Sequence, residues 1–295
     1  MTEATTGGSH KLTLLEILKK STDYLAARGV DQPRLAAELL TAQALECRRL
    51  ELYLRFERIP AEPELVRIRA GLTRLGAGEP VQYVLGTADF MHEHLVIDRR
   101  VLIPRPETEQ LVEKILETTE LGALSSAQIA DVGTGSGCIA LALARAWPTA
   151  RIWAVDRSPE AIEVASDNAR RAGAAGVIPT VGDLLAPFQP ASLDAVIGNL
   201  PYIPSADCET LPRNVRDFEP RSALDGGADG LDLIRRLVEE ARSVLRPGGW
   251  LFLEIGAGQG AAVRAILTGY EAVEIFQDYA GHDRIVRARR GGNPA

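Results

Sequence analysis

The chain has 295 residues, of which 46% are hydrophobic and 25% are charged, and its formal net charge at pH 7 is −7. This length and composition predict a globular protein with two domains, or one large domain with an appendage. The acidic balance argues against direct binding of nucleic acid, which needs a basic excess to neutralise phosphates. No apolar run approaches the ~20 residues of a membrane span, and the start of the chain lacks a signal-peptide layout, so we expect a cytoplasmic protein that does not bind membranes.

The cysteines and histidines predict neither a disulfide framework nor a metal site. Cys47, Cys138 and Cys208 lie far apart and form no Cys-x-x-Cys pair. His92 and His94 form a His-x-His pair that would lie on one face of a strand. No acidic or thiol cluster accompanies this pair, so we expect a solvated strand face and no bound metal.

The first predicted domain, residues 1–80, is a small helical bundle, although the polar stretch 1–10 lies outside the predicted fold. Between residues 12 and 28 apolar side chains recur at helical spacing, and Gly29 ends this stripe. Pro33 lies in the first turn of a second helix. Further helical segments are predicted at residues 49–56 and 61–76.

Residues 81–104 are predicted to form a β-hairpin connector. In "VQYVLGTADFMHEHLVIDRRVLI" the hydrophobic period changes, and β-rich stretches flank turn-like polar residues. The hairpin would join the helical bundle to the domain that follows.

Residues 105–295 alternate between predicted helices and strands. The helices are expected at 107–119, 137–146, 159–172, 229–245 and 259–267, and the strands at 128–132, 151–155, 177–181, 193–198, 249–255, 271–277 and 284–289. Such alternation predicts a mostly parallel sheet covered by helices on both faces. The last two strands, joined by "DYAGHD", would form a hairpin that makes one strand antiparallel. The long irregular segment 203–228 is expected to be a lid or a binding loop.

A glycine-rich turn between a strand and a helix, "IADVGTGSGCIALALA", is the first chemical signal. Glycines at positions 133, 135 and 137 let the backbone turn tightly and approach a ligand closely. We therefore predict a cofactor site at this turn, made of Gly133, Thr134, Gly135, Ser136 and Gly137.

Two downstream aspartates indicate which cofactor the turn binds. Asp156 ends the next strand, where its carboxylate would accept hydrogen bonds from ribose hydroxyls. Both nicotinamide enzymes and S-adenosylmethionine enzymes use this arrangement, so an oxidoreductase is one alternative. Asp131, in an Asp-x-Gly-x-Gly-x-Gly pattern, favours S-adenosylmethionine. So does Asp183, placed to accept from the adenine amino group while Leu184 packs beside the ring.

A second glycine pattern, "EIGAGQG", has no matching acid downstream. We expect it to bind no cofactor.

The tetrapeptide "NLPY" at residues 199–202 ends a buried strand and is the second chemical signal. Asn199 offers a side-chain oxygen, and Pro201 disfavours the helical conformation for Leu200, whose carbonyl becomes a second acceptor. Tyr202 adds an aromatic surface. These residues predict a clamp for a planar NH₂ group that is methylated on nitrogen, with Asn199, Pro201 and Tyr202 as catalytic candidates and all four as substrate-binding residues. A turn that only ends the strand is the alternative.

Seven segments together resemble one known family. They are "EPVQYVLG", "VLIPRPETEQLV", "DVGTGSGCIALALA", "NLPYI", "EPRSALDGGADGLDLIRRL", "LEIGAGQG" and "DYAGHDRIV". In this order the chain resembles the release-factor glutamine N5-methyltransferases, the HemK/PrmC family. The resemblance implies a class I S-adenosylmethionine-dependent methyltransferase fold, a doubly wound, mostly parallel seven-stranded sheet with an antiparallel C-terminal strand, plus an N-terminal helical domain that helps to hold the protein substrate.

The resemblance also implies an activity and a partner. The activity is methylation, from S-adenosylmethionine, of the glutamine side chain in the Gly-Gly-Gln loop of peptide chain release factors. By the same analogy Asn199 contacts the cofactor as well as the glutamine. Thr108 and Glu109 in "IPRPETE" would either approach the methionine tail of the cofactor or cap a helix.

One departure from the family pattern concerns the substrate. The family carries Asn-Pro-Pro-Tyr, whereas this chain has Leu200 in place of the first proline. Asn-Leu-Pro-Tyr also resembles the motif of ribosomal RNA adenine dimethyltransferases. The alternatives are therefore an amino-methyltransferase acting on adenine in nucleic acid, and a non-catalytic module that binds the cofactor and docks on a partner.

Overall fold

The computed structural model describes residues 11–292 and divides the chain into two compact units, Met1–Leu85 and Gly86–Ala295. The polar stretch at residues 1–10 lies outside the described residues. Among the helices described, none is both long and apolar enough to cross a membrane.

The first unit is helical, as the sequence predicts. Its elements are α1 (Leu14–Ala26), α2 (Pro33–Ala44), the 3₁₀ helix η1 (Arg49–Leu54), α3 (Glu62–Gly76) and α4 (Val81–Leu85). Helix α1 starts with a capping box: the Thr13 side chain accepts from the Glu16 N–H, and the Glu16 carboxylate accepts from the Thr13 N–H at 2.8 Å. Leu14, Leu18 and Leu25 are buried, which confirms the helical stripe.

Helix α4 replaces part of the predicted hairpin. Residues 81–85 were expected to be β-rich, but the Val84 N–H donates to the Pro80 carbonyl at 3.1 Å and Tyr83 is buried. A proline just before the first helical turn loses no hydrogen bond there, and burial of the aromatic ring outweighs the β-propensity of the two valines. The hairpin itself is shorter than predicted, with β1 (Thr87–Phe90) antiparallel to β2 (Glu93–Val96).

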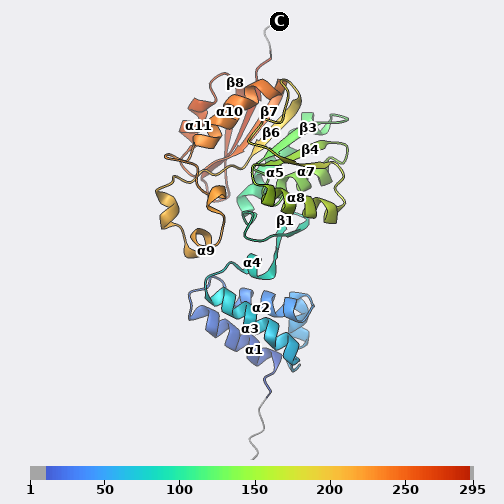
Figure 1. The fold of residues 1–295 in the computed structure, drawn as a ribbon, viewed down its shortest axis with the longest axis vertical. Helices are drawn as coiled ribbons and strands as arrows, with labels where there is room; N and C mark the ends of the chain where they lie inside the picture. Colours follow the sequence, from blue (N-terminus) through green and yellow to red (C-terminus); the bar gives the residue numbers. More distant parts are fainter. Residues whose placement is uncertain (1–10, 293–295) are drawn as a thin grey trace, which may run out of the picture. The chain divides into compact units, whose positions relative to one another are not determined.

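The second unit contains a seven-stranded sheet in the order β5-β4-β3-β6-β7-β9-β8 (Figure 1). The strands are β3 (Gln128–Val132), β4 (Arg151–Asp156), β5 (Val177–Val181), β6 (Leu193–Gly198), β7 (Leu245–Glu254), β8 (Tyr270–Gln277) and β9 (Asp283–Arg290). Strands β3 to β7 are parallel, and β9 pairs antiparallel with both β7 and β8. The predicted mostly parallel sheet with an antiparallel C-terminal strand is confirmed.

Helices cover both faces of the sheet (Figure 1). They are α5 (Pro106–Leu116), α6 (Thr119–Gly122), α7 (Cys138–Ala146), α8 (Pro159–Ala172), α10 (Asp232–Val244) and α11 (Gly260–Ile266). Helices α5, α7 and α8 pack on one face, and α10 with α11 packs on the other. The chain therefore has the doubly wound arrangement that the alternation predicts.

Three predicted elements differ from the structure. The helix expected at 107–119 ends at Leu116, and a separate short helix, α6, begins at Thr119. The strand expected at 249–255 begins earlier: β7 starts at Leu245, because this residue already pairs with Leu193 of β6. The segment 203–228 is less irregular than expected, since it contains the short helices η2 (Asp207–Thr210), α9 (Arg213–Arg216) and η3 (Arg221–Ala223).

The order of the strands determines where a ligand can bind. Strand β3 lies between β4 and β6, so the direction in which successive strands are added reverses beside β3. In open α/β sheets, ligands bind outside the carboxyl ends of the strands at this switch point. The glycine turn follows β3, and Asn199 follows β6, so both lie at this edge.

Candidate functional site

The glycine turn after β3 adopts a conformation that favours glycine. Gly133, Gly135 and Gly137 have φ angles of +74°, +53° and +82°. The N–H groups of Gly133 and Thr134 donate to the Val155 carbonyl of β4 at 2.8 and 2.9 Å, which fixes the start of the turn. A Cβ atom added to Gly135 would have the Gly133 carbonyl oxygen, at 4.0 Å, as its nearest neighbour. A ligand can therefore approach the backbone here.

Asp131 lies beneath this turn and is only 1% exposed. Its Oδ2 accepts hydrogen bonds from the Thr134 hydroxyl at 2.6 Å and from the Ala140 N–H at 3.2 Å. Its Oδ1 has no partner within residues 11–292. Burial raises the pKa of this carboxyl to about 6 despite the two hydrogen bonds. Asp131 thus retains an acceptor that a donor, such as an ammonium group or a water molecule, would satisfy.

Asp156 ends β4, and two backbone donors orient its carboxylate. Oδ2 accepts from the Gly135 N–H at 3.1 Å, and Oδ1 accepts from the Ser158 N–H at 2.9 Å. Ser158 also caps α8, since its hydroxyl oxygen accepts from the Ala161 N–H at 3.1 Å. Each carboxylate oxygen keeps a further lone pair, so a pair of ribose hydroxyls can still donate to it.

Asp183 and Leu184 follow β5 at the rim of the same site. Leu184 has a φ angle of +47° and is 6% exposed. The Asp183 Oδ2 pairs with the Arg236 guanidinium of α10 at 2.7 Å. Both side chains of this ion pair are about half exposed, so the pair contributes little stability, but it limits the positions of the carboxylate.

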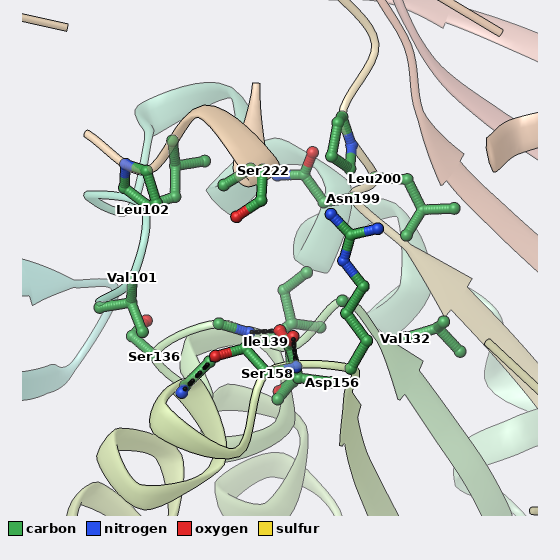
Figure 2. Close-up of a pocket in the computed structure, with 18 of the residues that line it drawn as sticks. Val101, Leu102, Val132, Ser136, Ile139, Asp156, Ser158, Asn199, Leu200 and Ser222 are labelled. Carbon is green, nitrogen blue, oxygen red and sulfur yellow. Dashed lines mark hydrogen bonds between the residues drawn. The ribbon is translucent and has the colours of Figure 1, made fainter. Parts of the chain in front are cut away.

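One pocket joins these groups to the residues after β6 (Figure 2). Of the predicted cofactor-binding residues it is lined by Gly133, Thr134, Gly135, Ser136, Asp156, Asp183, Leu184 and Asn199. Gly137 does not line the pocket; it precedes α7, and a Cβ atom placed on it would lie 3.3 Å from the Ala165 Cβ. Part of the remaining wall comes from the segments 100–105 and 220–223, which contribute residues such as Leu102 and Ser222 (Figure 2).

The first three residues of the predicted clamp line the pocket together. The Asn199 side-chain NH₂ donates to the Thr108 hydroxyl oxygen at 2.9 Å. Among the described residues, no donor reaches the Asn199 Oδ1 or the Leu200 carbonyl. The Leu200 side chain is 4% exposed and packs beneath the turn, with its Cδ2 3.0 Å from a Cβ placed on Gly133. Pro201 completes this part of the wall.

Tyr202 is not among the residues that line this pocket. Its hydroxyl donates to Glu254 Oε1 at 3.2 Å, and its carbonyl accepts from the Gln259 side-chain NH₂ at 3.0 Å. The Arg284 guanidinium lies 6.0 Å from the centre of its ring. Burial raises the pKa of this phenol, and the negative charge of the adjacent Glu254 raises it further, so Tyr202 keeps its proton.

The structure does not support helix capping as the role of Thr108 or Glu109. Helix α5 has Arg105 at its N-cap, without a side-chain cap. Thr108 is 2% exposed, its hydroxyl instead donates to Glu254 Oε2 at 2.7 Å, and the residue lines the pocket. The Glu109 carboxylate accepts from the Met91 N–H, so it holds the turn of the hairpin.

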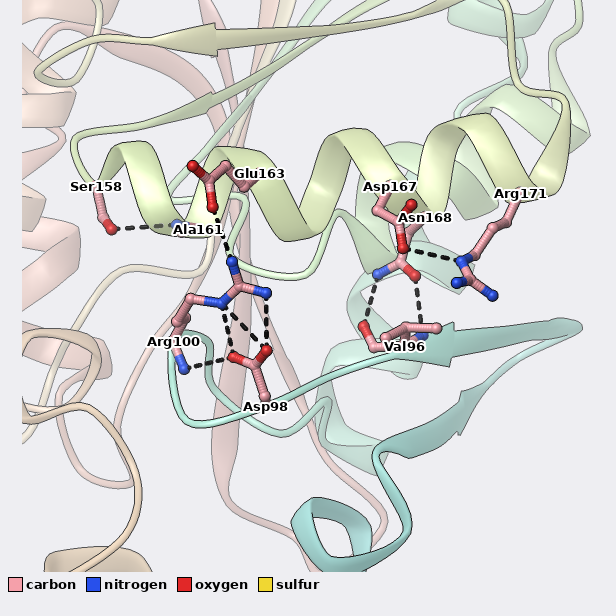
Figure 3. A network of polar contacts seen from close by, with 9 residues as sticks. All are labelled: Val96, Asp98, Arg100, Ser158, Ala161, Glu163, Asp167, Asn168 and Arg171. Carbon is pink, nitrogen blue, oxygen red and sulfur yellow. Dashed lines mark hydrogen bonds and ion pairs between the residues drawn. The ribbon is translucent and has the colours of Figure 1, made fainter.

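Two further polar contacts that the sequence pattern does not reveal support the pocket. Asn168 of α8 exchanges hydrogen bonds with both backbone groups of Val96 (Figure 3). It also donates to the Ser136 carbonyl at 2.9 Å, which links the hairpin to the glycine turn. Glu219 accepts from the Ile103 N–H at 3.2 Å and pairs with Arg105, which joins two walls of the pocket. The sequence hints at the first contact only by placing an asparagine on an otherwise apolar helix face.

Comparisons with known proteins cover both units. Residues 16–86 match the family model described as the PrmC N-terminal domain, and residues 129–218 match the one described as a methyltransferase domain. A solved protein-(glutamine-N5) methyltransferase (release factor-specific) from Alicyclobacillus acidocaldarius is 28% identical, with a TM-score of 0.39, over 64% of this chain and 94% of that chain.

Curated relatives align along almost the full length. The release factor glutamine methyltransferase of Moorella thermoacetica is 46% identical over 95% of this chain and 99% of its own length. The protein of the same name from Geobacter sulfurreducens is 42% identical over 95% of this chain and 97% of its own length. With this identity over nearly the whole of both chains, the chain belongs to the family of release factor glutamine methyltransferases.

Proposed function

We propose that this protein methylates the side-chain amide nitrogen of the glutamine in the Gly-Gly-Gln loop of peptide chain release factors, with S-adenosylmethionine as the methyl donor. One observation carries the proposal: the Asn199 Oδ1 and the Leu200 carbonyl lack donors among the described residues, and both residues line the pocket beside the glycine turn. Two acceptors suit the two N–H groups of a planar amide. The curated relatives bear the name of this activity.

The residues around the pocket suit this cofactor. We assign the turn Gly133–Gly137 to its amino-acid portion, Asp156 to its ribose hydroxyls, and Asp183 with Leu184 to its adenine. The unpartnered acceptor of Asp131 and the open space above Gly135 support this assignment. When bound, S-adenosylmethionine supplies an electrophilic methyl group on a positively charged sulfur.

The clamp residues address the poor nucleophilicity of an amide nitrogen. The nitrogen lone pair is shared with the carbonyl, and complete loss of that resonance costs about 18–20 kcal/mol. As the nitrogen gains positive charge during transfer, hydrogen bonds from it to Asn199 and Leu200 strengthen to roughly 1.5–3 kcal/mol each. Pro201 keeps the Leu200 carbonyl in place. The ring of Tyr202 as an aromatic surface for the amide remains a prediction.

Positioning supplies the larger part of the catalysis. An oriented nucleophile can gain about 7–11 kcal/mol over a free one. No histidine is among the described residues that line the pocket, and a protonated amide product loses its proton to water readily. We therefore assign no general base to this site.

The N-terminal unit is proposed to recognise the protein substrate. Residues 16–86 match the model described as the PrmC N-terminal domain, and a relative that aligns over 95% of this chain is named release factor glutamine methyltransferase. Because release factors work in translation, we place the reaction in the cytoplasm, and we expect the enzyme to contact them directly without binding nucleic acid.

Mass spectrometry tests the proposal. The protein is incubated with S-adenosylmethionine and a release factor, either wild type or with the loop glutamine replaced, and any added methyl group is mapped. We expect one methyl group on the loop glutamine and none on the replaced substrate. Methylation that persists without that glutamine, or transfer to adenine in an added RNA or DNA, would overturn the assignment.

The substitution Asn199→Ala tests the clamp. Loss of one acceptor for the developing charge is expected to lower kcat by about 10²–10³-fold. Asp156 and the glycine turn remain, so the Kd for S-adenosylmethionine should change only modestly. Turnover near the wild-type rate would remove Asn199 from the mechanism.

A further inference from the structure

Glu254, at the carboxyl end of β7, is buried against the clamp. It is 1% exposed, and each of its carboxylate oxygens accepts one hydroxyl: Oε2 from Thr108 at 2.7 Å and Oε1 from Tyr202 at 3.2 Å. Thr108 lines the pocket, and Tyr202 is the last residue of the clamp. A buried carboxylate with one donor on each oxygen fixes the direction of both hydroxyl groups.

The direction of the Thr108 hydroxyl in turn fixes the Asn199 amide. A threonine hydroxyl has one proton, and here it points to Glu254, so its oxygen is available only as an acceptor. The Asn199 NH₂ donates to that oxygen at 2.9 Å. The hydrogen bonds therefore run in one direction, from Asn199 to Thr108 to Glu254. The Asn199 Oδ1 is left for another donor.

The second glycine pattern, "EIGAGQG", holds Tyr202 from the other end. The Gln259 Oε1 accepts from the Gly256 N–H at 2.8 Å, and its NH₂ donates to the Tyr202 carbonyl at 3.0 Å. A Cβ atom on Gly256 would lie 2.9 Å from the Gln259 Oε1 and 3.3 Å from the Tyr202 ring. This segment, which contributes no residue to the described lining of the pocket, thus contacts Tyr202 at its hydroxyl, ring and carbonyl.

We infer that Glu254 is a positioning residue for methyl transfer. Through Thr108 it keeps the side-chain oxygen of Asn199, and not its NH₂, directed to the substrate amide that receives the methyl group. It also holds Tyr202 directly, through the hydroxyl of the ring. This inference rests on the proposed function, because it concerns a substrate whose methylated group is a planar NH₂. If the Asn199 amide were reversed, its own NH₂ would face the NH₂ of the substrate, and both groups are hydrogen-bond donors. The clamp would then lose one of its two acceptors.

The test compares Thr108→Val with Thr108→Ser in the full-length protein. Valine matches threonine in shape but lacks the hydroxyl, whereas serine keeps it. We expect Thr108→Val to lower kcat for release-factor methylation by about 10²-fold, the effect of removing one oriented group that stabilises charge. Thr108→Ser should restore most of that loss. The Kd for S-adenosylmethionine, measured by calorimetry, should stay within about threefold in both variants.

Glu254→Gln and Tyr202→Phe separate the two arms of Glu254. A carboxamide must donate from one side, so Glu254→Gln disturbs the chain of hydrogen bonds and should lower kcat as much as Thr108→Val. Tyr202→Phe removes only the second arm and should cost less. If Thr108→Ser is as impaired as Thr108→Val, or if Glu254→Gln keeps the wild-type kcat, the positioning role is overturned.

A substrate-free measurement separates this inference from the proposed function. Proton exchange of the Asn199 side-chain NH₂ with water, followed by NMR, should be slow in the wild type and at least tenfold faster in Thr108→Val. Equal exchange rates would overturn the proposed positioning of Asn199 by Thr108 and Glu254, whatever the substrate is. A wild-type protein that does not methylate release factor, but shows the expected difference in exchange, would contradict only the proposed function.

Discussion

Leu200 occupies the position where the family carries proline, and Leu200→Ala tests what its side chain does. The side chain is 4% exposed and points into the core beneath the glycine turn. It lies 3.0 Å from a Cβ placed on Gly133 and 3.6 Å from one placed on Gly198. Both neighbours are glycines and have no side chain that can move into the vacated space.

The expected magnitude follows from this poor ability to relax. Buried Leu→Ala substitutions lower the free energy of unfolding by about 2–5 kcal/mol, and the cost rises with the volume of the cavity left behind. Because backbone surrounds Leu200 on two sides, we expect a loss of about 3–4 kcal/mol. The pocket should also lose part of its floor, so the affinity for S-adenosylmethionine should fall together with stability.

Urea unfolding followed by tryptophan fluorescence is a suitable assay. All three tryptophans, Trp147, Trp153 and Trp250, belong to the second unit, so the signal reports on the unit that contains the site. Leu124→Ala is the matched control: its side chain is 42% exposed, and we expect a change of about 1 kcal/mol or less. If Leu200→Ala is no more destabilising than this control, Leu200 does not support the turn.

Two further predictions concern the glycine turn. The pKa of Asp131 is raised to about 6 from 3.8, so its contribution to stability is complete below pH 3.8 and is lost as the pH rises through about 6. Relative to Asp131→Asn, the wild type should therefore lose about 2–2.5 kcal/mol of unfolding free energy between pH 4 and 7, and a constant difference would contradict this. Gly137→Ala should destabilise the protein more than Gly173→Ala. Both glycines have a positive φ, so alanine costs about 1–2 kcal/mol at either position. Only a Cβ on Gly137 also meets Ala165. Equal losses would show that crowding there is unimportant.

The periodicity of the sequence predicts most of the fold, for physical reasons that the structure makes clear. Strands β3 and β6 are short apolar runs between turn residues, and they are buried on both faces in the parallel sheet. Helix α4 was missed because its five residues are too few to show a helical period, and tertiary burial of Tyr83 decides their conformation.

The pocket was predictable where a residue follows a strand, and not where it depends on long-range contacts. The glycine turn, Asp156 and Asn199 each follow a parallel strand, so the topology alone brings them to one edge of the sheet. The contact of Thr108 with Glu254 spans 146 positions in the sequence, and no local pattern encodes it. The same holds for Asn168, whose partner in the hairpin is 72 positions away.

The most direct test of the clamp is a crystal structure of the protein with S-adenosylhomocysteine and a release-factor peptide that contains the loop glutamine. The account predicts that the glutamine amide nitrogen lies within about 3.2 Å of both the Asn199 Oδ1 and the Leu200 carbonyl oxygen. An amide nitrogen held by other groups, with these two oxygens facing away from it, would contradict the account.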